Sequence, residues 1–190
     1  METKIYAVQL SGSLKDSEIV SLLNCANVYC RKKYENTKIK SRAEASLVAN
    51  ALVLFALKDA FGLDVRKIRL GTLSSGKPVL LGCDNIFFSI SHCGGLVACA
   101  VSRTPVGIDV EKIRKHNPLV AGRFLSPMQT ERIEFSENKD EAFTREWTVF
   151  EAGAKLFGDG IFKYRHTPLF SFETIRFGNC FISVATCPDN

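Results

Sequence analysis

The stretch Phe87–Glu111, FFSISHCGGLVACAVSRTPVGIDVE, predicts three short strands separated by two turns. Gly94–Gly95 supply the positive φ angles that a tight reversal needs, and Pro105 presets the second turn. Along the third strand, Asp109 and Glu111 are two residues apart, so their carboxylates point to the same face. Two acids on one face of a mostly apolar strand repel each other and lose hydration unless a cation lies between them. The pair therefore indicates half of a metal site.

A helix predicted from about Asp140 to Phe157 supplies a third acid. Trp147, Glu151 and Lys155 recur every four residues along one edge of its apolar stripe. Together with the strand pair, Glu151 would suffice for Mg²⁺, which favours a few carboxylates, several waters and phosphate oxygens. Lys155, one turn further on, could reach the same phosphate oxygens. The alternatives are a solvated strand face and an ordinary i,i+4 ion pair.

Two other polar residues accompany turns. His92 precedes the double glycine, so a ligand contact competes with a hydrogen bond to the turn backbone. GTLSSGKP at Gly71–Pro78 nearly matches a P-loop, but Pro78 replaces the hydroxyl residue that would hold magnesium, and no helix is predicted to follow. We interpret the segment as a turn that presents Lys77, a residue type that is usually solvated in turns.

Composition and charge narrow the class of protein. The chain has 190 residues, enough for one domain or two small halves, and is 46% hydrophobic and 24% charged, as soluble globular proteins are. It has no apolar run near the roughly 20 residues that span a bilayer and no signal peptide, so we expect a cytoplasmic protein that does not bind membranes. Seven cysteines without a C-x-x-C pair argue against a disulfide framework or a zinc site.

The net charge of +5 belongs to the first half of the chain. Residues 1–102 hold 13 Lys and Arg against 8 Asp and Glu, whereas residues 103–190 hold 12 of each. Arg31–Arg42 concentrates six of these basic residues around Glu35. Such a patch attracts nucleic acid, a polyphosphate cofactor or an acidic protein, and the alternative is a solvated helix end and loop.

The other elements are predicted from periodicity, caps and turn residues. We expect strands at Lys4–Leu10, Val65–Leu70, Val79–Leu81, Leu169–Phe172, Thr174–Phe177 and Cys180–Thr186, helices from Asp16 or Ser17 towards Tyr29, over about Ser41–Phe61 and from Ser126, and a turn through Lys112–Pro118.

Four motifs resemble, in order and spacing, the signature of 4′-phosphopantetheinyl transferases, most closely the class that activates surfactin synthetase and similar assembly lines. They are Gly76–Pro78 (GKP), Phe88–His92 (FSISH), Val106–Glu111 (VGIDVE) and Trp147–Lys155 (W-x-x-x-E-A-x-x-K). The resemblance is weaker before Gly76.

The resemblance implies an α+β fold with two similar halves packed as a pseudo-dimer in one chain. Residues 1–102 would bind the nucleotide end of coenzyme A, and residues 103–190 would carry the metal site and the carrier-protein side. The implied enzyme is a monomer that uses Mg²⁺ to move the 4′-phosphopantetheine arm of coenzyme A to a serine of an apo acyl or peptidyl carrier protein. It releases adenosine 3′,5′-bisphosphate.

The resemblance also assigns roles by position. The metal ligands would be Asp109, Glu111 and Glu151, and Glu151 would also be the base that takes the serine proton. Lys155 would contact the transferred phosphate. The contacts to the nucleotide end would be Lys77, Pro78, Ser91 and His92.

Two positions depart from the family pattern. The residue before Glu151 is often lysine in the family and is Phe150 here, so any role of that lysine is absent or supplied elsewhere. A basic residue usually precedes the small hydroxyl residue of the N-terminal helix, and that place is Ala45 here. Arg42 and Lys40 are displaced candidates for cofactor binding.

Two alternative functions remain open. Phe150 is the best argument for a catalytically impaired relative that only binds coenzyme A or a carrier protein. Arg31–Arg42 is the basis for a nucleic-acid-binding domain, but apart from Tyr29 and Tyr34 the patch lacks interleaved stacking aromatics. We therefore expect coenzyme A and a carrier protein, not nucleic acid, as partners.

Overall fold

The computed structural model describes residues 3–74, 76–158 and 170–188. Its elements, in chain order, are β1 (Lys4–Gln9), α1 (Asp16–Cys25), α2 (Val28–Asn36), α3 (Lys40–Phe61), β2 (Leu70–Thr72), β3 (Pro78–Leu80), β4 (Phe87–Cys93), β5 (Leu96–Ser102), β6 (Val106–Lys112), α4 (Pro118–Phe124), α5 (Pro127–Glu134), α6 (Lys139–Phe157), β7 (Ser171–Phe177) and β8 (Cys180–Thr186).

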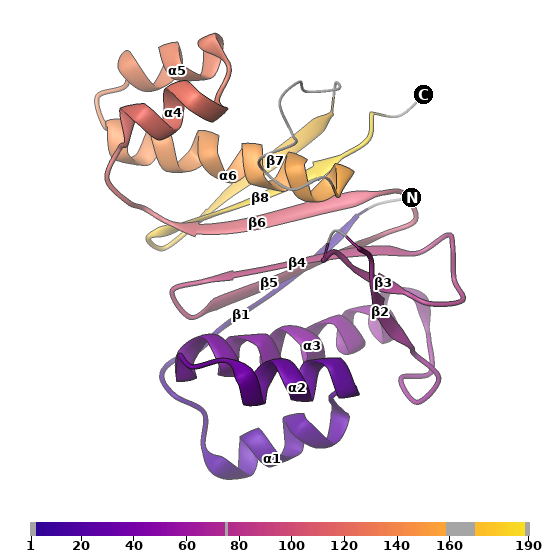
Figure 1. Cartoon of the computed structure of the whole chain (residues 1–190). Helices are drawn as coiled ribbons and strands as arrows, with labels where there is room; N and C mark the ends of the chain where they lie inside the picture. Colours follow the sequence, from indigo (N-terminus) through magenta and orange to yellow (C-terminus); the bar gives the residue numbers. More distant parts are fainter. Residues whose placement is uncertain (1–2, 75, 159–169, 189–190) are drawn as a thin grey trace.

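Most of these elements form four layers, with the two three-stranded sheets in the middle and helices on the outer side of each (Figure 1). The halves have similar topologies, because each begins with a strand, continues through three helices and ends in a β-hairpin, and the first half adds the two-stranded sheet β2-β3 before its final hairpin. In each sheet the first strand pairs with the second strand of the hairpin, giving the orders β1-β5-β4 and β6-β8-β7. The expected α+β fold with two similar halves is confirmed, although the sequence contains no repeat that would indicate the similarity of the halves.

Strand β5 joins the two halves of the core. All seven of its residues are buried, which agrees with the unbroken apolar run of its first six residues. Leu96, Ala98 and Ala100 face the core between the sheets, together with apolar residues of β6 and β8. The alternate side chains of β5 face α3, whose residues are buried on several sides as its continuous apolar pattern predicts.

Gly107 lets α6 lie directly on β6. A Cβ atom at this position would be 2.0 Å from the carbonyl oxygen of Ala152 and 2.5 Å from the backbone nitrogen of Leu156. Because side chains alternate along a strand, Asp109 and Glu111 point to the same face of β6 as Gly107, which is the face that α6 covers. The close approach therefore sets the final turns of α6, which include Lys155, beside the acids of β6.

The predicted first helix is wrong in its extent. It ends at Cys25, and α2 begins separately after Asn27, whose side-chain oxygen accepts a hydrogen bond from the Cys30 backbone N–H at 2.8 Å. The basic run Arg31–Arg42 therefore covers the end of α2, a short connection and the start of α3.

Three other boundaries also differ from prediction. The strand expected at Val65–Leu70 begins only at Leu70, and a turn precedes it. The Asp64 carboxylate stabilises this turn by accepting hydrogen bonds from the backbone and side chain of Arg66. After Glu111 the chain forms the unpredicted α4, which Asn117 caps. The two strands expected between Leu169 and Phe177 are the single strand β7, and Leu169 itself lies outside the described residues.

Several local predictions are confirmed. Ser126 caps α5 in a capping box with Gln129, and α3 and α6 end at glycines in the left-handed conformation. Gly178 and Asn179 form the turn between β7 and β8.

Within the described ranges, no helix combines the length and apolar character needed to cross a membrane.

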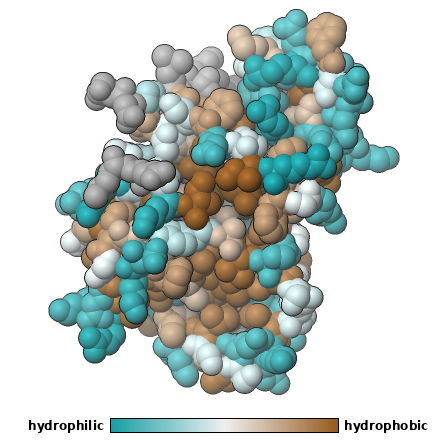
Figure 2. Space-filling model, turned by 180° about the vertical axis from the view of Figure 1, so that it is seen from behind, coloured by the Kyte–Doolittle hydropathy of each residue, from teal (hydrophilic) through white to brown (hydrophobic). Residues whose placement is uncertain are grey.

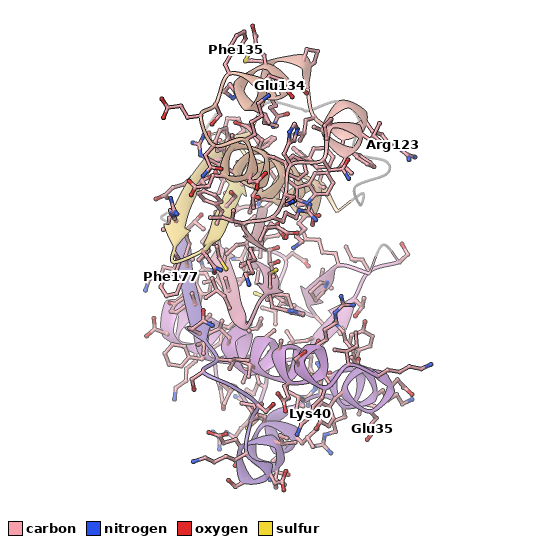
Figure 3. All side chains as sticks on the ribbon, turned by 90° about the vertical axis from the view of Figure 1, so that its left-hand side faces the viewer. Glu35, Lys40, Arg123, Glu134, Phe135 and Phe177 are labelled. Carbon is pink, nitrogen blue, oxygen red and sulfur yellow. The ribbon has the colours of Figure 1, made fainter. Side chains whose placement is uncertain are left out.

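Exposed apolar side chains follow the two outer strands. Val8 of β1 and Phe172, Ile175 and Phe177 of β7 are exposed at the free edges of their sheets. Figure 3 shows Phe177 on the outside of the molecule. From behind, apolar residues gather across the middle of the face, whereas the region of α4 and α5 at the upper right is mostly hydrophilic (Figure 2).

Candidate active site

Three acids from two elements converge where α6 lies on β6. Asp109 and Glu111 come from the strand and Glu151 from the helix, and each offers one carboxylate oxygen within 4.8 Å of the others. Asp109 is only 2% exposed, and its Oδ2 atom has no hydrogen-bond partner among the described residues. Because a buried carboxylate oxygen without a partner is costly, and because three carboxylates suit a hard cation, these residues fit Mg²⁺.

Lys155 offsets part of this negative charge. Its Nζ atom donates to Asp109 Oδ1 at 2.6 Å and to Ser91 Oγ at 2.9 Å, and Ser91 Oγ donates to the same Oδ1 at 2.9 Å. The ion pair of Lys155 is therefore with the strand, not with Glu151 one helical turn away. Asp109 thus uses one oxygen for Lys155 and Ser91, while its other oxygen has no hydrogen-bond partner among the described residues.

Burial and the charge of Asp109 raise the pKa of the two other acids. The pKa of Glu151 is raised to about 7, first by burial and then by the charge of Asp109, against the opposing effect of Lys155. Burial and the charge of Asp109 also raise the pKa of Glu111, which Arg114 lowers. Both shifts mean that full ionisation of the cluster is unfavourable without a cation, as the spacing of the two strand acids predicted.

A cavity of about 420 Å³ brings the acids together with residues of the first half. Seven of the ten predicted site residues line it: Pro78, Ser91, His92, Asp109, Glu111, Glu151 and Lys155. Other lining residues include Tyr29, Lys33, Ser46, Gly76 and Cys93. The site is therefore assembled from both halves of the chain.

Lys77 has a different place. Its Nζ atom donates to the backbone carbonyl oxygens of Lys155 and Leu156, at 2.6 and 3.0 Å. These carbonyls belong to the last turn of α6, where the helix dipole favours a cation. Burial lowers the pKa of Lys77. The structure therefore places the ammonium group on the end of α6, while the neighbours Gly76 and Pro78 line the cavity.

Lys40 and Arg42 do not line the cavity either. Lys40 is largely exposed, its Nζ atom lies 3.7 Å from Glu44, and it sits among the N-terminal helices (Figure 3). Arg42 acts at a distance, because its charge helps to lower the pKa of His92, after the larger effects of burial, Lys33 and Lys155.

Sequence reasoning missed Tyr29 and Lys33 as individual site residues. They lie one turn apart on α2 and both line the cavity. The prediction included Lys33 only in the basic patch Arg31–Arg42, because it expected the preceding helix to end before the basic run. The available signal was Asn27, a residue type that commonly caps a new helix.

Phe150 is a core residue. It is 5% exposed, and its ring centroid lies 5.5 Å from that of Trp147 and 6.0 Å from that of Phe124. It belongs to the apolar cluster under α4 and α5, and it is not among the cavity-lining residues of the described chain. The departure from the family lysine therefore exchanges a charged side chain for core packing.

Comparison with known proteins identifies one family. A family model for the 4′-phosphopantetheinyl transferase superfamily matches residues 105–188. The chain is 30% identical over 172 residues to a 4′-phosphopantetheinyl transferase of Bacillus subtilis, an alignment that covers 90% of this chain and 75% of the relative. It is 36% identical over 110 residues to the 4′-phosphopantetheinyl transferase HetI of Nostoc sp., covering 54% of this chain and 46% of HetI.

A carboxylate cluster with an adjacent lysine, in a cavity that both halves line, suits an enzyme that acts on phosphate groups. This chain belongs to the 4′-phosphopantetheinyl transferase family. The resemblance drawn from the four motifs is confirmed.

Proposed function

We propose that the chain transfers the 4′-phosphopantetheine arm of coenzyme A to a serine of an apo acyl or peptidyl carrier protein, releasing adenosine 3′,5′-bisphosphate. Family membership supports the reaction. The observation that carries it here is the convergence of Asp109, Glu111, Glu151 and Lys155 on a cavity that both halves line.

The first half, residues 1–102, would bind the nucleotide end. The cavity volume of about 420 Å³ is in the range of small-molecule sites. Lys33 and His92 line it and Arg42 is within electrostatic reach, so phosphate groups meet cations and hydrogen-bond donors there. Ser46 occupies the place of the family's small hydroxyl residue and also lines the cavity.

The second half, residues 103–190, would carry out the transfer. Asp109, Glu111 and Glu151 would hold Mg²⁺, which when bound supplies electrostatic stabilisation of the charge that develops on phosphate oxygens. Lys155 places a positive charge beside the transferred phosphate. Glu151 accepts the hydroxyl proton of the carrier serine as the serine oxygen bonds to the pantetheine-bearing phosphorus. The bond to the bridging oxygen breaks, and that oxygen leaves with the electron pair on adenosine 3′,5′-bisphosphate.

One chain supplies both sides of this cavity, so a monomer is sufficient for activity. The test combines the protein with Mg²⁺, coenzyme A and apo carrier proteins of fatty-acid, polyketide and peptide-synthetase systems. We expect the intact mass of at least one carrier to rise by a single phosphopantetheine. An impaired relative would instead show a higher melting temperature with coenzyme A but no mass gain on any carrier.

Asp109→Asn tests the metal site, because it keeps the shape of the side chain and removes its charge. We expect this variant to lose transfer and the Mg²⁺-dependent rise in melting temperature, while it remains folded. Asp84→Asn, the same change at an exposed turn, should leave both unaltered. A D109N variant that retains full transfer would rule out Asp109 as a metal ligand.

A further inference from the structure

Cys93 places a free thiol beside the carboxylate cluster. It is the last residue of β4, it lines the same cavity, and its Sγ atom lies 3.9 Å from Glu111 Oε2. The buried and unpartnered Oδ2 atom of Asp109 belongs to the same cavity and marks a position that a cation would satisfy. The cavity thus combines sulfur and oxygen ligands, a combination that Mg²⁺ does not use.

The separation of the thiol from Glu111 suits a softer metal. Zn²⁺ binds thiolate sulfur at about 2.3 Å and carboxylate oxygen at about 2.0 Å, so a tetrahedral ion holds the two ligand atoms about 3.5 Å apart. The observed 3.9 Å is a few tenths of an ångström longer. Both side chains are only partly buried, and small rotations about their own bonds can close this difference.

We propose that this centre has a second, thiophilic mode of metal binding, in which Cys93 and Glu111 are the protein ligands of Zn²⁺ or Cd²⁺. The thiol proton passes to solvent when the ion binds. Because Glu111 serves both modes, a thiophilic ion and Mg²⁺ exclude each other. Zn²⁺ is therefore an inhibitor of the transfer reaction. This inhibition rests on the proposed transferase function, whereas the binding of Zn²⁺ does not.

The first test is Cd²⁺ titration of the reduced, metal-free protein, followed by the ultraviolet charge-transfer absorption of a cadmium–thiolate bond. We expect one equivalent to give this band in the wild-type protein and in Cys25→Ser, whose exposed thiol is the matched control. The band should be lost in Cys93→Ser. A Cys93→Ser variant with an unchanged band would overturn the proposal.

The second test measures Zn²⁺ affinity by competition with a chelating dye. Loss of one ligand should weaken binding about tenfold or more in Cys93→Ser, while the Mg²⁺-dependent rise in melting temperature is retained. Glu111→Gln should lose both the Mg²⁺ effect and the Cd²⁺ band, and persistence of the band would show that the thiol binds metal apart from the carboxylates.

The two proposals fail separately. A wild-type protein that never modifies a carrier in Mg²⁺ refutes the transferase function, yet leaves the Cd²⁺ band to be observed. Equal Zn²⁺ inhibition of wild type and Cys93→Ser, in an enzyme that is active in Mg²⁺, refutes only the thiophilic mode.

Discussion

Gly107→Ala should disable the site without changing any residue that contacts substrate. The added Cβ would lie 2.0 Å from the Ala152 carbonyl oxygen, and ordinary contact begins near 3.4 Å, so the helix and strand must separate by about 1.4 Å. Both obstructing groups belong to the α6 backbone, which cannot rotate away as a side chain can. Lys155 Nζ, now 2.6 Å from Asp109, moves with the helix.

Overpacking of this kind costs about 1 to 3 kcal/mol of unfolding free energy. A displacement of about 1 Å at a catalytic site can lower the rate about 100-fold. We therefore expect Gly107→Ala to have a lower melting temperature and a transfer rate reduced by about two orders of magnitude. The rate is measured from the time course of carrier mass at saturating coenzyme A and Mg²⁺.

Gly122→Ala is the control, because a Cβ on this α4 glycine meets no atom within 4 Å. It should be neutral or slightly stabilising, since alanine favours helix more than glycine does. A Gly107→Ala variant with the stability and rate of the wild type would refute the view that close contact between α6 and β6 positions the acids.

Two further predictions concern Lys77 and the carboxylates. Lys77→Met removes two charge-assisted hydrogen bonds to the end of α6, worth about 1.5 to 3 kcal/mol each, and should lower both the melting temperature and the transfer rate. If Lys77 acted only as a coenzyme A contact, the KM for coenzyme A would rise with an unchanged melting temperature. The pKa of Glu151 is about 7 in the folded protein, above the ordinary value of 4.5. Between pH 4.5 and 7 the folded state therefore binds more protons than the unfolded state. The free energy of unfolding of the metal-free protein should consequently fall as the pH rises through this range. Denaturant titrations should show a smaller fall for Glu151→Gln and for the wild type in Mg²⁺, and an equal fall in all three would contradict the assignment.

The sequence predicted most of the elements near the site because their signals are local. Glycines mark the turn after Cys93 and the ends of the long helices, and apolar periodicity marks α3 and α6. The failures occurred where one short polar group decided the structure. Asn27 divides a helix that looks continuous, and Asp64 turns a segment that alternates like a strand.

The common face of Asp109 and Glu111 was determined by the sequence alone, since a period of two residues fixes it. The helical spacing of Trp147, Glu151 and Lys155 made Glu151 the candidate third acid. Only the tertiary structure decided which side chains meet across the halves. Lys155 pairs with Asp109, 46 positions away, Lys77 reaches the end of α6, and Cys93 reaches Glu111. These contacts depend on how closely α6 lies on β6 and β4 on β6, a matter of packing between residues distant in the chain. No local pattern encodes such distances, although Gly107 makes one of them possible.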